Sequence, residues 1–189
     1  MALLYLVRHG PTAVDPTLPQ DQWHLSKEGV DVVRDWAKSQ SWTGVDQLYA
    51  SPELKARETA DIVGEVAKVP VGIDEGLREL GVPFIASRSQ FLDRMERYLA
   101  GFPDPEFEPW EAAQERMASS IDTIQARHPG ESIALVSHGR ILTAFLSRIL
   151  GRRLTCDEWL AIQMPDVAIV DLPAGFLTRR FAGWTVGRA

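Results

Sequence analysis

Cysteine is almost absent from this sequence of 189 residues. The single cysteine, Cys156, excludes an internal disulfide and any metal site built from several thiolates. The four histidines also lack the His-Glu-x-x-His spacing of a helical zinc site. We therefore expect a protein without a bound metal.

Long apolar runs and an excess of positive charge are missing as well. The first apolar run covers only residues 3–7, which is too short for the apolar region of a signal peptide or for a membrane span. Cytoplasmic residence without membrane attachment is the default expectation. The formal net charge of −6 gives the whole molecule no electrostatic attraction to nucleic acid, so any anionic ligand must be held by local positive charge.

What is present is an ordinary globular composition, with 45% hydrophobic and 24% charged residues, which excludes global disorder. The length suits one domain, so we expect residues 1–189 to form a single domain. Between residues 81 and 110, prolines and aromatic side chains interrupt the pattern. We expect this segment to be an insertion, with one helix near residues 90–99, that lies over the end of the sheet as a lid.

Short apolar runs alternate with stretches of helical periodicity along the chain. The runs typical of buried strands are residues 3–7, 45–50, 69–73 and 133–136. Two helices are expected to begin at the capping hydroxyls of Ser26 and Ser51. A third helix is expected over residues 111–127, and a fourth after the last of these apolar runs. Residues 168–172 and 176–184 are expected to form a final antiparallel pair. This order predicts an α/β fold, a three-layer sandwich with a mostly parallel central sheet and helices on both faces.

Two histidines stand at the ends of two of these runs. Arg-His-Gly at residues 8–10 follows the first run, and Ser-His-Gly at residues 137–139 follows the fourth. The carboxyl ends of parallel strands form the ligand-binding edge of such a sheet, so neighbouring strands would bring His9 and His138 to face each other across one pocket. The planar guanidinium of Arg8 suits a phosphate group. A lone strand-end histidine is more often structural, but the pair favours a functional site.

Together with three further motifs, these residues resemble the histidine phosphatase superfamily, which has a phosphoglycerate mutase-like fold. The further motifs are Leu-Ser-Lys-Glu-Gly at residues 25–29, Ser51-Pro52 with Leu54, Arg57 and Thr59, and Leu-Arg-Glu at residues 77–79. They occur in the family's order and span most of the chain. The resemblance implies phosphoryl transfer through a phosphohistidine intermediate, without a metal or another cofactor.

The resemblance also implies roles for individual residues. His9 is the nucleophile, Glu79 is the general acid and base, and His138 is a further catalytic residue that also contacts the phosphate. The other phosphate-binding positions are Arg8, Arg57, Thr12 and Gly139. These residue types suit the chemistry, because the transferred phosphoryl group carries charge on three oxygens and is stabilised by preorganised donors.

The charges in this arrangement bear on the protonation of His9 and Glu79. The arginines should keep His9 neutral by like-charge repulsion. Glu79 must be protonated when it delivers a proton to the leaving group, which predicts an activity optimum on the acidic side of neutrality. Without the motif context, Glu79 would be a solvated loop residue, and Arg57 would be a surface charge paired with Glu53 or Asp61.

Two positions depart from the family's pattern. Many members continue Arg-His-Gly with Glu-Thr-x-Trp-Asn, whereas Asp15 stands here at the Asn position and offers only acceptors. Asp15 either turns away from the pocket or meets a cation. Arg140 replaces a frequent glycine after Ser-His-Gly, and either contacts a second acidic group of the substrate or lies on the helix surface. Both residues are candidates for substrate binding.

From these residues we predict a metal-independent phosphomonoester hydrolase that acts on a small phosphorylated metabolite or a phosphoprotein. One alternative is a phosphoglycerate-type mutase, which would need longer segments to shield phosphohistidine from water. The other is a catalytically weak, phosphate-binding regulatory module. The aromatic residues of the inserted segment either contact an apolar part of the substrate or fill a small core; they include Phe84, Phe91, Phe102, Phe107 and Trp110.

Overall fold

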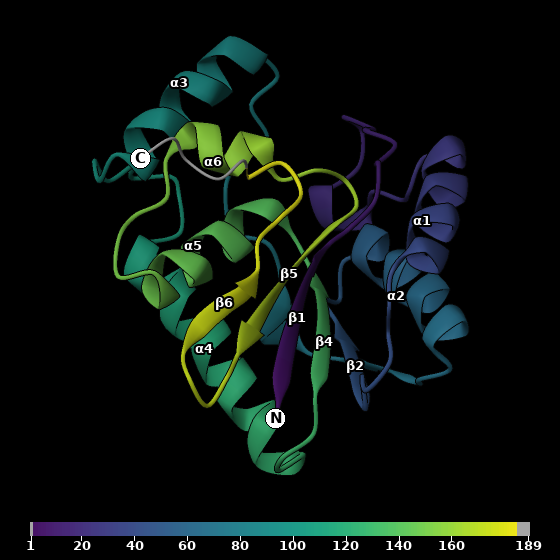
Figure 1. Ribbon diagram of the computed structural model, residues 1–189. Coiled ribbons are helices and arrows are strands. Elements are labelled where there is room, and N and C mark those ends of the chain that lie inside the picture. Colours follow the sequence, from purple (N-terminus) through teal and green to yellow (C-terminus); the bar gives the residue numbers. More distant parts are fainter. Residues whose placement is uncertain (1, 185–189) are drawn as a thin grey trace.

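The computed structural model describes residues 2–184, and its centre is a six-stranded sheet (Figure 1). In chain order the strands are β1 (Leu3–Arg8), β2 (Gln47–Ala50), β3 (Val71–Ile73), β4 (Ile133–Ser137), β5 (Asp166–Asp171) and β6 (Phe176–Arg179). Across the sheet their order is β3-β2-β4-β1-β5-β6. The first four in this order are parallel, and β5 and β6 run antiparallel to their neighbours. The predicted mostly parallel sheet and its final antiparallel pair are confirmed, although β6 ends at Arg179.

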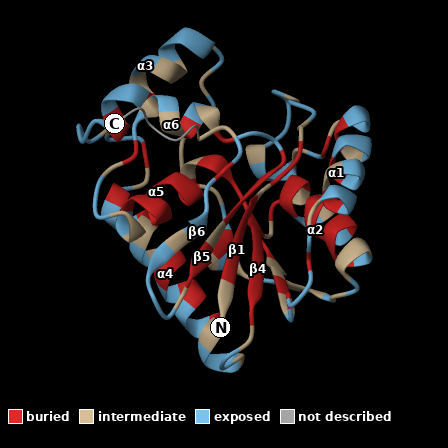
Figure 2. Ribbon diagram, in the orientation of Figure 1, coloured by how far each residue is buried: buried red, intermediate tan, exposed pale blue. Residues whose placement is uncertain are grey.

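Helices cover both faces of the sheet, which confirms the predicted three-layer sandwich. One face carries α1 (Lys27–Ser39) and α2 (Leu54–Ala67), and the other carries α4 (Trp110–Arg127) and α5 (Gly139–Ile149). On the side of α4 and α5, two further helices lie beyond the end of the sheet: α3 (Arg88–Leu99) and α6 (Cys156–Ala161). Side chains alternate along β1, so Tyr5 and Val7 join the apolar cluster of α1 and α2, and Leu4 and Leu6 join the other. Buried residues accordingly run through the centre of the molecule on both sides of the sheet (Figure 2).

The register of β1 and β4 brings the two histidine motifs together. Arg8 pairs with Ser137 in the parallel ladder, and the amide of His9 donates to the carbonyl oxygen of Ser137 at 3.0 Å. Because the two strands are adjacent and parallel, His9 and His138 follow them at the same edge of the sheet.

The starts of α1 and α2 differ in how they are capped. Ser26 caps α1 as expected, since its hydroxyl accepts from the amide of Gly29 at 2.9 Å. Helix α2 begins only at Leu54, and the hydroxyl of Ser51 instead hydrogen-bonds with Nε2 of His138 at 2.7 Å. The expected cap at Ser51 is therefore wrong, because this hydroxyl belongs to the strand-end site.

The segment of residues 81–110 contains α3 between two loops. Phe107 and Trp110 are buried in the core, whereas Phe84 and Phe91 line a cavity beside the strand-end histidines. The segment thus borders that cavity; its movement as a lid stays a prediction, as does the organisation of the chain as one domain. Within residues 2–184, no helix is long and apolar enough to cross a membrane.

Candidate active site

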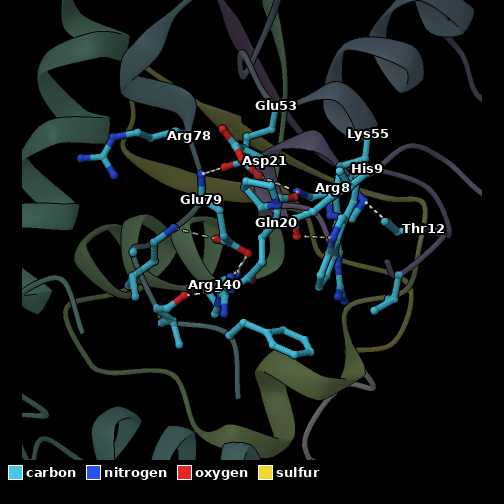
Figure 3. Close-up of a pocket in the computed structure, with 18 of the residues that line it drawn as sticks. Arg8, His9, Thr12, Gln20, Asp21, Glu53, Lys55, Arg78, Glu79 and Arg140 are labelled. Carbon is cyan, nitrogen blue, oxygen red and sulfur yellow. Dashed lines mark hydrogen bonds and ion pairs between the residues drawn. The ribbon is translucent and has the colours of Figure 1, made fainter. Parts of the chain in front are cut away.

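His9 lines a cavity of about 650 Å³ at the carboxyl ends of the parallel strands (Figure 3). Its Nδ1 lies 2.8 Å from the carbonyl oxygen of Gly10, and because a carbonyl can only accept, Nδ1 carries the proton. This leaves Nε2 with its lone pair and without a hydrogen bond in the described part of the chain. Burial lowers the pKa of His9 well below its usual value, and His138, Arg8 and Lys55 lower it further. The expected neutral imidazole is consistent with this direction, but its main cause is burial rather than the arginines.

His138 packs edge-on against His9, with the two ring centroids 5.1 Å apart. The side chain is fully buried, and burial lowers its pKa to about 3, so it is neutral as well. Its Nε2 is paired with Ser51, while its buried Nδ1 has no hydrogen-bond partner among residues 2–184. His138 thus stands behind His9 with one ring nitrogen unsatisfied.

Arg8 lines the cavity from the end of β1. One guanidinium nitrogen donates to the carbonyl oxygen of Ile162, and the buried Nε has no partner within the described residues. The guanidinium lies over Gly139, where an added Cβ would come within 3.1 Å of its Cζ. Gly139 is therefore placed beneath Arg8 rather than in the cavity wall, and its lack of a side chain leaves room for the guanidinium.

Lys55, and not the predicted Arg57, is the residue of α2 whose positive charge lines the cavity. Arg57 is exposed on α2 and lies away from the cavity, so its predicted place in the site is wrong. Lys55 lines the cavity and is 6% exposed; its Nζ donates to Glu53 Oε2 at 2.5 Å and to the carbonyl oxygen of Gln20 at 2.8 Å. Residues two apart on a helix point in nearly opposite directions, which explains why one faces the cavity and the other solvent.

Glu79 also lines the cavity, with its carboxylate fixed by several donors. The amides of Leu80 and Ile141 donate to Oε1 at 2.9 Å, and Nε of Arg140 lies 3.2 Å from Oε2. Burial raises the pKa of Glu79, but Arg140, His138 and these amides outweigh burial and hold it at about 2. With these partners Glu79 is ionised near neutral pH, whereas the role of a general acid requires a proton on it.

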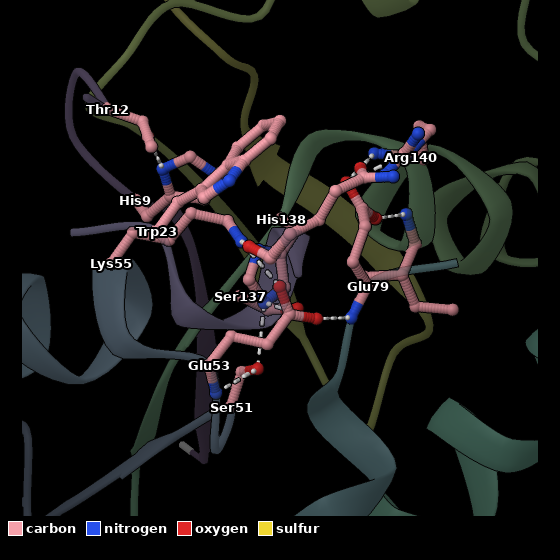
Figure 4. A network of polar contacts seen from close by, with 12 residues as sticks. His9, Thr12, Trp23, Ser51, Glu53, Lys55, Glu79, Ser137, His138 and Arg140 are labelled. Atoms are coloured by element: carbon pink, nitrogen blue, oxygen red, sulfur yellow. Dashed lines mark hydrogen bonds and ion pairs between the residues drawn. The ribbon is translucent and has the colours of Figure 1, made fainter. Parts of the chain in front are cut away.

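Glu53 is a buried carboxylate that sequence reasoning treated only as a surface ion-pair partner of Arg57. Its Oε1 accepts from the amide of Glu79 at 2.7 Å and lies 3.5 Å from Nε2 of His138, while Oε2 binds Lys55 (Figure 4). One carboxylate thus holds both the backbone of Glu79 and the side chain of Lys55 in place. The available signal was its place in the chain, because Glu53 stands at the N-cap of α2, next to the strand-end edge.

Comparison with known proteins agrees with this geometry. The sequence profile of the histidine phosphatase superfamily (branch 1) matches residues 4–178. The chain belongs to this superfamily. Similar proteins include the probable phosphoglycerate mutase GpmB of Cronobacter sakazakii, which is 28% identical over 90% of this chain and 85% of that protein.

Solved structures share the superfamily fold. A phosphoserine phosphatase mutant from Entamoeba histolytica in complex with phosphoserine aligns with a TM-score of 0.74 and 19% identity over 96% of both chains. A phosphoglycerate mutase from Bacillus anthracis aligns with a TM-score of 0.68 and 21% identity over 96% of this chain and 92% of that one. At these identities the likeness shows a phosphoglycerate mutase-like fold.

The three remaining predicted site residues are Thr12, Asp15 and Arg140. Thr12 lines the cavity, and its Oγ1 lies 3.4 Å from Nδ1 of His9. Asp15 turns away, because its Oδ1 accepts from the amide and hydroxyl of Thr17 at 2.9 and 2.6 Å. Arg140 lies in the cavity wall with its side chain only 12% exposed, and is bound to Glu79 rather than free for a second acidic group of a substrate. Among residues 2–184, no group of three or more metal-ligating side chains is placed to hold a metal ion.

Proposed function

We propose that this superfamily member is a phosphomonoesterase that transfers a phosphoryl group to Nε2 of His9 and then to water. The observation that carries the proposal is the state of His9: a neutral imidazole in the cavity wall, with its Nδ1 proton held by Gly10 and its Nε2 lone pair available. A neutral ring nitrogen with a fixed tautomer is what nucleophilic attack requires.

In the first step, Nε2 attacks phosphorus and the ester P–O bond breaks. Arg8 and Lys55 line the cavity and their charges act on His9, and they would hold the phosphoryl oxygens as charge spreads over them. The unsatisfied Nε of Arg8 supports this proposal, since a buried N–H without a partner costs about 1–3 kcal/mol and a bound phosphoryl group supplies acceptors.

Glu79 would serve both halves of the reaction. A bound phosphate dianion raises the pKa of a neighbouring carboxylate by like-charge repulsion, so substrate binding favours the protonated form that gives its proton to the leaving alkoxide. The carboxylate left behind then takes a proton from water as the water oxygen attacks phosphorus and the P–N bond breaks. Inorganic phosphate leaves, and both His9 and Glu79 return to their starting states.

A phosphoglycerate-type mutase is the second candidate, because curated relatives carry that name. A mutase must hold the carboxylate of phosphoglycerate while the phosphoryl group returns to it. Besides Arg8 and Lys55, two described cations stand in the cavity wall, Arg140 and Arg78. Arg140 is paired with Glu79, and Nη2 of Arg78 lies 3.4 Å from Oε1 of Glu108. Arg78, whose side chain is 45% exposed, is the group that would bind this carboxylate in a mutase, so the two reactions differ in their acceptor, which is either water or the phosphoglycerate.

Phosphate release separates the two reactions. A labelled phosphomonoester should give inorganic phosphate at the same rate with and without unlabelled 3-phosphoglycerate, and His9→Ala should abolish the release. Transfer of label to the phosphoglycerate would establish the mutase, and undiminished release by His9→Ala would refute both candidates.

A further inference from the structure

Two aromatic pairs line the cavity beyond the phosphate-binding end. Trp23, which follows the short helix η1 (Gln20–Gln22), meets Phe84 edge-to-face with ring centroids 5.9 Å apart. Phe91 of α3 meets Trp159 of α6 in the same way, also at 5.9 Å. All four rings belong to the wall of the cavity that contains Arg8, His9 and Lys55. We refer to Trp23, Phe84, Phe91 and Trp159 as the aromatic slot.

The slot continues into an apolar hollow. A second hollow of about 240 Å³ shares Trp23, Phe84, Phe91 and Arg140 with the main cavity and adds apolar side chains from residues 83–86. Phe84 remains 47% exposed although it is large and apolar. Burial of an exposed aromatic face by a ligand is favourable, so this surface is suited to contact rather than to solvent.

The aromatic residues of the 81–110 segment therefore divide between two roles. Phe107 and Trp110 fill the core, each 5% exposed, whereas Phe84 and Phe91 face the cavity. Phe102 is 60% exposed and lies outside the described walls of both hollows. Phe102 thus provides a matched control for the two cavity residues.

The cations Arg78 and Arg88 border the two hollows only with exposed side chains, and the polar groups nearer to the slot are already paired. Nε2 of Gln20 already donates to the carbonyl oxygen of Val82 at 3.1 Å, and Arg140 is bound to Glu79. Asp21 adds an exposed carboxylate to the cavity wall, which repels a further anion. A flat apolar group is the occupant that leaves fewest polar groups unsatisfied here.

We propose that the aromatic slot binds the aromatic ring of the leaving group, so that the preferred substrates are small aryl phosphomonoesters. This rests on the proposed function for the position of the phosphate, which His9, Arg8 and Lys55 would fix at the other end of the cavity. The ring then packs against Phe84 and Phe91 in edge-to-face or offset geometry, which stabilises it beyond simple area burial.

Binding of non-hydrolysable phosphonates to the wild-type protein, measured by calorimetry, tests the slot without turnover. We expect 1-naphthylmethylphosphonate to bind at least about tenfold more tightly than methylphosphonate. Phe84→Ala should remove most of this preference while leaving the affinity for methylphosphonate unchanged, Phe84→Leu should restore part of it, and Phe102→Ala should keep all of it.

Equal binding of the two phosphonates, or no binding of either, would overturn the slot. A preference that survives Phe84→Ala in full would also overturn it. These outcomes are separate from failure of the proposed function: tight naphthyl binding without phosphate release from any ester would leave the slot in place and refute the phosphatase. Hydrolysis of esters together with equal binding of both phosphonates would support the phosphatase and refute the slot.

Discussion

Lys55 and Glu53 form an ion pair of 2.5 Å between two side chains that are both less than 10% exposed. The pair leaves Lys55 anchored at the cavity wall, while Arg57, two positions along α2, is exposed. Within the superfamily motif it is thus a lysine that supplies the second positive charge beside Arg8.

The first prediction concerns these two cations. Lys55→Ala should lower kcat/KM for a phosphomonoester by about 10²–10³-fold, because it removes a preorganised charge from the transferred phosphoryl group. Lys55→Arg should recover part of the loss, and Arg57→Ala should stay within about twofold of wild type because it alters only an exposed side chain. Steady-state kinetics of the three variants decide the assignment. A large loss in Arg57→Ala with full activity in Lys55→Ala would restore the sequence-based expectation.

The second prediction concerns the pH dependence of the nucleophile. Burial holds the pKa of His9 well below its usual value, so we expect the imidazole to resist protonation as the pH falls from 7 to 5. We expect kcat/KM, which reports the free enzyme, to be kept or to rise over this range. A tenfold fall in kcat/KM between pH 7 and pH 5 would show instead that His9 becomes protonated in this range.

The third prediction concerns stability in acid. The pKa of His138 is about 3 in the folded protein and near 6.5 when exposed, so the unfolded chain binds a proton below pH 6.5 that the folded protein does not. The stability that His138 contributes is therefore complete above pH 6.5 and is lost as the pH falls. Between pH 6.5 and 5 this amounts to about 2 kcal/mol in the free energy of unfolding.

Urea unfolding at the two pH values measures this effect. The decrease in the free energy of unfolding should be about 2 kcal/mol smaller in His138→Asn than in wild type, since the variant has no imidazole to protonate. Identical decreases in both proteins would show that His138 titrates equally in the folded and unfolded states.

The fourth prediction concerns Asp15. Its carboxylate closes a local turn on Thr17 and points away from the cavity. Asp15→Ala should therefore change kcat/KM and the inhibition constant of inorganic phosphate by no more than about twofold. A tenfold change in either value would place the carboxylate near the bound phosphate.

The elements that the sequence predicts well are those with a strong local pattern. The apolar runs at β1 and β4 identify two buried strands, and their ends place His9 and His138 at one edge of the sheet. Helix α6 is harder to predict because it has six residues and a single buried side chain, Trp159. Its capping box of Thr155 and Glu158 was the signal that could have identified it.

The parts of the site that the sequence does not predict depend on which way a side chain points. A linear motif does not distinguish Lys55 from Arg57, whereas their helical phase does: Lys55 shares a face with the buried Thr59, four positions on. The roles of Glu53 and Ser51 depend on contacts with Glu79 and His138, which lie more than 25 positions away in the chain. Such long-range contacts leave no periodic trace in a sequence.

In the proposed mechanism, His9 carries the phosphoryl group during turnover. Brief mixing with a ³²P-labelled phosphomonoester, followed by a denaturing quench and peptide mapping, detects this intermediate. We predict an acid-labile, base-stable label on the peptide that contains His9, and no label on His9→Ala. An unlabelled protein together with continued hydrolysis by His9→Ala would contradict the covalent mechanism.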